Sequence, residues 1–342
     1  MPLQDVIGHA AVIASIQRAE ASNRLAHAYL FHGEASIGKR LTAVRLTQAF
    51  HCEQRQDGAV IDACGVCRSC RHVEASTHPD FLVIEPDSEQ AVPQIKIEQI
   101  REIEQQIMYR PLIAERKICL IDQADRMTIG AANALLKTLE EPPDHSLFFL
   151  ISSRPAALPV TIRSRCQALR FTTPPRTQVE AALILKREIP PSDTRLLAII
   201  SEGRLGDALV ADPAEIRARQ REVMELIRPQ TLGSVTAILA QAESSAKSDR
   251  VPELLSWLTR WIRDVIILQV GGDRDHILFA EDLETLEMYS KHADTDALLD
   301  ILCDIEQTDR QATRHLNLQM ALEQVLLRLR DACTAQPVSQ RS

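Results

Sequence analysis

Residues 28–40 read AYLFHGEASIGKR, a short apolar run followed by a glycine-rich loop and a lysine. The apolar run has the length of a buried strand, and residues 39–50 have a helical pattern. The spacing G-x-x-x-x-G-K, with Gly33, Gly38 and Lys39, is that of a phosphate-binding loop between a strand and a helix. Backbone N–H groups of such a loop hold phosphate oxygens, and the helix N-terminus and the lysine add positive charge. A plain glycine turn is the alternative, and this strand-to-helix context favours the phosphate loop.

Strands and helices alternate along the first 170 residues. Strands are expected where short apolar runs occur, and helices where apolar residues recur every three to four positions. This alternation predicts a parallel sheet flanked by helices. The expected strands are 28–32, 81–84, 118–121 and 147–151, and the expected helices are 12–24, 39–50, 94–109 and 130–139.

After Phe171 the pattern becomes helical, and Thr172–Pro175 reads as a linker. The sequence therefore predicts one α/β domain followed by two all-α domains. The expected divisions are an α/β domain at 1–170 with a cysteine-rich insert at 52–70, a small helical domain at 171–225, a larger helical domain at 226–333 and a flexible tail at 334–342.

Composition excludes several classes of protein. The 342 residues are 45% hydrophobic and 25% charged, as in a folded protein. No apolar run approaches the roughly 20 residues that a membrane-spanning helix needs, and the N-terminus lacks a signal pattern, so we expect a cytoplasmic protein without a membrane partner. A net charge of −8 argues against a bulk DNA binder, and 4% aromatic residues are too few for base-stacking surfaces.

Two positions depart from the pattern of a working nucleotide site. Arg40 follows the lysine where a Ser or Thr hydroxyl would bind Mg²⁺, and a guanidinium has no acceptor for a metal. Asp122 ends the expected strand at 118–121 in the manner of a metal-directing aspartate. The next residue is Gln123, which cannot accept a proton as a glutamate can. We therefore expect a degenerate site with poor or no ATP binding and no ATPase activity of its own.

Four cysteines lie close together in the insert. The pattern C-x11-C-x2-C-x2-C, formed by Cys52, Cys64, Cys67 and Cys70, is typical of a closed tetrahedral zinc site. Such a site leaves no position for a water, so one structural zinc ion is expected; redox-active or merely clustered thiols are the alternative. Core packing is expected for Cys119, Cys166 and Cys303.

Three motifs carry a family resemblance. They are Ile7-Gly8-His9, the segment NALLKTLEEPP at 133–143 and Ser164-Arg165-Cys166. Together with the phosphate loop, they resemble bacterial DNA polymerase III clamp-loader subunits of the AAA+ class. The resemblance implies an AAA+ α/β domain, an all-α lid and an all-α collar. It also implies a zinc module and a place in an assembly that loads a sliding clamp onto primed DNA during replication.

Within that family the residues resemble the non-hydrolysing δ′ subunits. Arg40, Gln123 and Gly206 stand where the ATPase subunit, γ or τ, has a hydroxyl, a glutamate and a sensing arginine. The resemblance implies that Arg165 acts in trans as an arginine finger on a neighbouring γ/τ subunit. It implies γ/τ and δ subunits as partners, with the clamp and primed DNA reached through the complex, and no polymerase activity in this chain. The alternatives are an active γ/τ-type motor subunit and a zinc-containing DNA-binding adaptor.

Overall fold

The structure is a computed structural model that describes residues 2–55, 60–87, 92–187, 189–248, 250–311 and 317–334. It forms two compact units, Met1–Thr194 with Ser201–Val210, and Arg195–Ile200 with Ala211–Ser342. The predicted division into three domains is finer than this grouping and stays a prediction. The predicted tail lies outside the described residues apart from its first residue. Within the described residues, no helix is both long and apolar enough to cross a membrane.

The first unit contains a five-stranded parallel sheet, which confirms the predicted fold class. The four predicted strands are present. A fifth strand, which the sequence pattern does not predict, pairs with the first at the edge of the sheet, and its mostly exposed residues form no apolar run. The order is β2-β3-β4-β1-β5, with bounds β1 Ala28–His32, β2 Phe81–Ile84, β3 Lys117–Ile121, β4 Ser146–Ser152 and β5 Gln167–Arg170.

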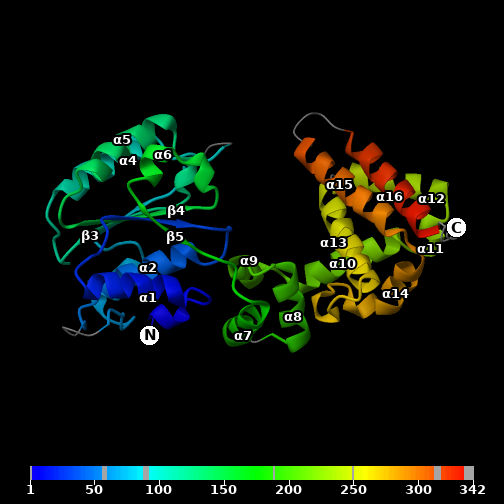
Figure 1. The fold of residues 1–342 in the computed structure, drawn as a ribbon, viewed down its shortest axis with the longest axis horizontal. Helices are drawn as coiled ribbons and strands as arrows, with labels where there is room; N and C mark the ends of the chain where they lie inside the picture. Colours follow the sequence, from blue (N-terminus) through cyan, green and yellow to red (C-terminus); the bar gives the residue numbers. More distant parts are fainter. Residues whose placement is uncertain are drawn as a thin grey trace, which may run out of the picture. The chain divides into compact units, whose positions relative to one another are not determined.

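Helices cover both faces of this sheet, because successive strand side chains point to opposite faces. In β1, Tyr29 and Phe31 pack with α1, α2 and α3, whereas Leu30 packs with α4, α5 and α6. Figure 1 shows α4 and α5 on one side of the sheet and α1 and α2 on the other. The bounds are α1 Ala10–Ala21, α2 Lys39–His51, α3 Arg68–Glu74, α4 Ile97–Met108, α5 Ile129–Glu140 and α6 Val160–Arg163.

The chain continues as helices. In the first unit, α9 packs on α7. These helices are α7 Arg176–Arg187, α8 Pro191–Ile200, which spans the division between the units, and α9 Leu205–Val210. Short 3-10 turns complete the described elements, namely η1 Pro2–Asp5, η2 Ala124–Arg126, η3 Pro155–Ala157, η4 Arg274–His276 and η5 Ala280–Asp282.

The second unit is built around α13, which packs against helices on several sides. Trp261 is fully buried and meets Tyr289 edge-to-face, with ring centroids 5.2 Å apart. Trp257 is also buried, so the apolar stripe around these two tryptophans belongs to the core. The helices are α10 Pro213–Leu226, α11 Pro229–Leu232, α12 Val235–Lys247, α13 Val251–Gln269, α14 Leu283–His292, α15 Thr295–Gln311 and α16 Leu318–Thr334.

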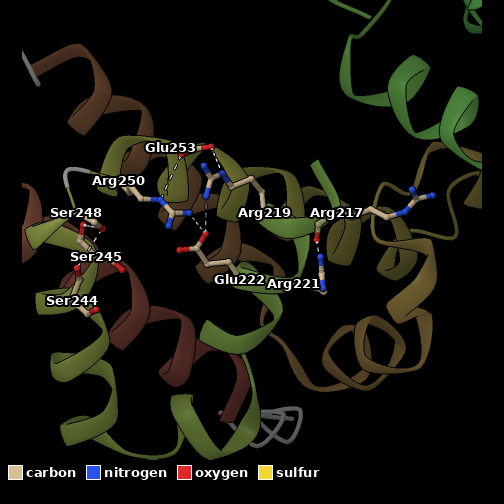
Figure 2. A network of polar contacts seen from close by, with 9 residues as sticks. All are labelled: Arg217, Arg219, Arg221, Glu222, Ser244, Ser245, Ser248, Arg250 and Glu253. Atoms are coloured by element: carbon tan, nitrogen blue, oxygen red, sulfur yellow. Dashed lines mark hydrogen bonds and ion pairs between the residues drawn. The ribbon is translucent and has the colours of Figure 1, made fainter. Parts of the chain in front are cut away.

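A network of charges joins α10 to the start of α13 (Figure 2). Arg219 Nε lies 2.6 Å from Glu253 Oε1, and Arg219 Nη1 lies 3.4 Å from Glu222 Oε2. Arg250 also pairs with Glu222, whose pKa is raised mainly by burial. Because two arginines face two glutamates, the network is balanced in charge and ties α10 to the helices that follow it.

A buried carboxylate fixes the loop before β3. Asp80 is fully buried and accepts backbone N–H bonds from Leu112, Ile113 and Ala114 at 2.7, 2.8 and 2.9 Å. Burial by itself would raise the pKa of Asp80, but these donors and His78 outweigh it and hold the pKa below its usual value. The carboxylate therefore stays ionised in the folded protein.

We expect Asp80→Asn to destabilise the chain by about 1–3 kcal/mol, because one amide group cannot accept bonds from all three donors. Since the folded pKa is lowered, the stabilisation by Asp80 is present above the unfolded pKa of about 3.9 and is lost as pH falls through the folded value. Urea unfolding at pH 7 and at pH 3.5–4 (about the unfolded pKa) should show a smaller loss in acid. Asp144→Asn, at an exposed position, is the control; equal losses at both positions would contradict this account.

Candidate functional site

The phosphate loop runs from the end of β1 to the start of α2, as the sequence predicts. Gly33 has φ +145°, and a Cβ there would lie 2.3 Å from the backbone oxygen of Phe171. Only glycine fits such an approach. Gly38, at φ +99°, directly precedes α2. The loop therefore has the backbone path that its glycines indicate.

Lys39 turns back into its own loop. Its side chain is buried, and Nζ donates to the backbone oxygens of Gly33, at 2.8 Å, and Glu34. Burial lowers the pKa of Lys39, although Asp122 opposes this effect. On the other side of the loop, His9 Nε2 donates to the Ile37 oxygen at 2.6 Å. The Ile7-Gly8-His9 motif thus braces the loop, a role that the sequence alone does not reveal.

Arg40 lies between two carboxylates at the ends of neighbouring strands. Its Nη1 is 3.2 Å from Asp122 Oδ2 and also pairs with Glu85, which follows β2. Both carboxylates thus pair with the same guanidinium. Its positive charge lies where a cation bound by the two carboxylates would otherwise lie. The sequence singles out Arg40 and Asp122, whereas Glu85 carries no motif and is found only because β2 and β3 are adjacent.

The residues after Asp122 shape the rest of this edge. Gln123 is exposed and adopts φ +49°, and its backbone N–H donates to Asp122 Oδ1 at 2.9 Å. Asp125, whose side chain is almost fully buried, accepts from Ser152 Oγ at 2.8 Å and from Arg154 Nε at 3.2 Å. No sequence motif marks Asp125, although its spacing from Asp122 places it beside the loop.

A pocket of about 710 Å³ opens at the phosphate loop, lined by Lys39, Arg40, Asp122 and Gln123 among others. Helix α9 forms part of the pocket wall and contacts the phosphate loop. The Gly206 N–H donates to the Ser36 oxygen at 2.8 Å, and a Cβ at Gly206 would lie 3.0 Å from that oxygen. The position aligned with a sensing arginine therefore has no side chain and little room for one.

Arg165 is held by the segment that contains the NALLKTLEEPP motif. Its Nη2 lies 2.5 Å from Glu140 Oε1, at the end of α5, and Nη1 donates to the Thr161 oxygen at 2.9 Å. One third of the side chain is exposed. An oriented, accessible guanidinium of this kind can approach an anionic group on another molecule.

The four predicted zinc ligands come together in one cluster. The sulfurs of Cys52, Cys64, Cys67 and Cys70 lie within 4.8 Å of one another. Val66 and Cys67 donate backbone N–H bonds to Cys64 Sγ at 3.4 and 3.2 Å. Burial by itself would raise the pKa of the Cys64 thiol, but these donors lower it to about 7. Four grouped thiols supported by N–H donors can hold a metal ion.

Among the described residues, the remaining cysteines lie outside the cluster. Cys119 and Cys166 are buried, as predicted, and burial raises the pKa of Cys166 to about 12. The prediction that Cys303 packs in the core is wrong, because it is exposed. Apolar residues recur along α15 at helical spacing, which gives the helix an apolar face and a polar face. Cys303 lies on the polar face.

Comparison with known proteins places this chain. The family description "DNA polymerase III, delta subunit" matches residues 8–175, and "DNA polymerase III, delta subunit, C terminal" matches residues 218–331. The delta' subunit of Bacillus subtilis DNA polymerase III is 29% identical over 90% of this chain and 92% of its own length. The delta' subunit of Pseudomonas aeruginosa is 30% identical over 75% and 76%. The tau subunit of Escherichia coli is 33% identical over 74% and 39%.

The parallel sheet, the phosphate loop and the helical segment closing on it define a protein of the AAA+ class. With both halves of the chain matched, the family is also clear. The chain belongs to the DNA polymerase III clamp-loader subunits.

We expect Arg40→Ala to create a cation site. Without the guanidinium, Asp122 and Glu85 would face each other, and the protein should lose about 1 kcal/mol or less, as is usual for exposed ion pairs. Millimolar Mg²⁺ should raise the melting temperature of the variant and leave that of the native protein unchanged. Arg154→Ala, which removes a neighbouring exposed arginine, is the control. An Mg²⁺ response equal in all three proteins would contradict the assignment.

Proposed function

We propose that this chain is a δ′-type subunit that does not hydrolyse ATP and that contributes to clamp loading as a scaffold. Its partners would be γ/τ-type ATPase subunits and a δ-type subunit, and it would reach the sliding clamp and primed DNA through the complex. Its own contribution to catalysis would be Arg165, presented to the nucleotide site of a neighbouring ATPase subunit.

The contact of Arg40 with Asp122 and Glu85 carries this proposal. A phosphate-loop ATPase needs Mg²⁺ near the aspartate, held by a hydroxyl after the lysine. Here a cationic side chain lies in contact with the aspartate and repels a metal ion. Gln123 also lacks the carboxylate that would activate water. These departures affect separate requirements of the reaction and therefore support one another.

Sequence identity does not separate the two kinds of subunit. The tau relative is as similar as the delta' relatives. The γ/τ-type motor therefore remains the alternative on similarity alone. The residues of the site favour the δ′ type, because a motor with Arg40 in this place would need another way to hold Mg²⁺.

The environment of Arg165 supports a role on a neighbour. An arginine finger stabilises the charge that develops on the phosphoryl group during transfer. The pair with Glu140 orients the guanidinium while leaving part of it exposed. Because this pair lies at the surface, its net stabilisation is small, and a stronger anion can displace Glu140.

We further propose that the cysteine cluster holds one structural zinc ion. Four thiolates at about 2.3 Å from zinc lie about 3.8 Å apart in a tetrahedron. The Cys64 and Cys70 sulfurs are 4.0 Å apart and the whole set lies within 4.8 Å, so small shifts complete the site. Zinc bound there would crosslink the end of α2, the following loop and α3, without an open position for chemistry.

To test the function, ATP hydrolysis is measured for the chain alone. It is then measured for a mixture of the chain with a γ/τ-type subunit, a δ-type subunit, the sliding clamp and primed DNA. We expect no activity alone and a lower rate in the mixture with Arg165→Ala. Loss of an arginine finger typically lowers the rate of phosphoryl transfer about 10³- to 10⁵-fold at its own site. The other ATP sites of the assembly keep their activity and so reduce the observed loss. Arg163→Ala, at an exposed arginine two residues earlier, should retain the native rate.

Several outcomes would count against this proposal. If the mixture with Arg165→Ala hydrolyses ATP at the native rate, Arg165 does not act as an arginine finger. Steady ATP hydrolysis by the chain alone would favour the alternative of an active γ/τ-type motor subunit. Tight, salt-sensitive DNA binding by the chain alone would favour the adaptor.

For the zinc site, we expect one zinc ion per native chain by elemental analysis and little or none in Cys67→Ser. The insert should loosen while the sheet stays folded, because the ion stabilises mainly the segment that it crosslinks. Cys303→Ser, which removes an exposed cysteine, should keep its zinc. A native protein free of zinc after purification without chelators would refute the site.

A further inference from the structure

Helix α2 connects the phosphate loop to the cysteine cluster, and a buried amide lies near its second end. Gln48 is only 2% exposed. It precedes Cys52 by four residues, and Cys52 directly follows the last residue of α2. A polar side chain buried this deeply requires hydrogen-bond partners.

The partners of Gln48 lie on α3, which carries Cys70, and on α2 itself. Its Nε2 donates to the backbone oxygen of Cys70 at 2.8 Å and to Glu74 Oε2 at 2.9 Å. Its Oε1 accepts from Arg45 Nη1 at 2.8 Å, and Arg45 also pairs with Glu74. Donor and acceptor contacts together fix the orientation of the amide.

The sulfur atoms are supported by the main chain of the module. Cys52 Sγ accepts from the Cys64 N–H, and Cys67 Sγ accepts from the Cys70 N–H, each at 3.4 Å. Cys70 is also held from outside the module. Its carbonyl bonds to the Gln48 side chain, and its thiol lies 3.9 Å from the Gln48 backbone oxygen.

We propose that Gln48 is a positioning residue for the zinc ion, acting through Cys70 and the register of α3 against α2. This inference rests on the zinc site proposed above. Groups that orient metal ligands from behind typically contribute 10- to 100-fold to metal affinity. Removing the amide keeps all four cysteines in the chain but frees α3 to shift, so the Cys70 sulfur would be held less firmly beside the other three.

The experiment compares zinc release from the full chain into excess chromophoric chelator. Gln48→Met keeps the length of the side chain and removes its hydrogen bonds. We expect it to release zinc about tenfold faster or more, and to change the visible spectrum of the Co²⁺-loaded protein. Thr47→Val, at the neighbouring buried position whose hydroxyl bonds within α2, should keep the native rate and spectrum.

A second variant covers the case in which Gln48→Met does not fold. Glu74 is half-exposed, so Glu74→Gln should fold. It should release zinc faster than the native protein but more slowly than Gln48→Met. Native release rates in every folded variant would overturn the role of Gln48 while leaving the zinc site intact. Equal acceleration by Thr47→Val would also overturn it, because the effect would then be general packing. Absence of zinc from the native chain would instead refute the site itself.

Discussion

Burial of α2 against the sheet is the constraint on which both candidate sites depend. The helix begins at Lys39 in the phosphate loop and ends beside Cys52 in the cysteine cluster. Between them Leu46 and Phe50 are buried in the core under the sheet, and a fully buried side chain of this kind contributes about 1.5–3 kcal/mol. The burial that fixes this helix therefore also fixes the positions of the phosphate loop and of the cysteine cluster at its two ends.

The phosphate loop keeps the form of a nucleotide site while its polar groups are satisfied internally. Lys39 bonds to carbonyls of its own loop, and Arg40 pairs with both Asp122 and Glu85. A nucleotide would have to displace the first contact, and a metal ion would have to displace the second. A well-formed loop can therefore accompany the weak nucleotide binding that we propose for this chain.

Much of this organisation is predictable from sequence, because apolar periodicity and glycine spacing report directly on strands, helices and turns. The loop and the four predicted strands are of this kind, and the spacing of the four cysteines predicts their cluster. Strand β5 is not, since its residues are mostly exposed and it is held by pairing with β1. Glu85 and Gln48 are also hidden, because their roles depend on which elements become neighbours. Cys303 shows the opposite error, in which residue type suggests burial and the helix face decides otherwise.

The contact between Gly206 and Ser36 has a consequence for conformational entropy. A loop that is ordered only by its ligand loses about 1–2 kcal/mol per residue when the ligand binds. In this chain α9 and Lys39 order the loop in advance. Under the scaffold role proposed above, a neighbouring subunit would therefore meet a preformed surface, whose shape would not follow the balance between ATP and ADP in the surrounding solution.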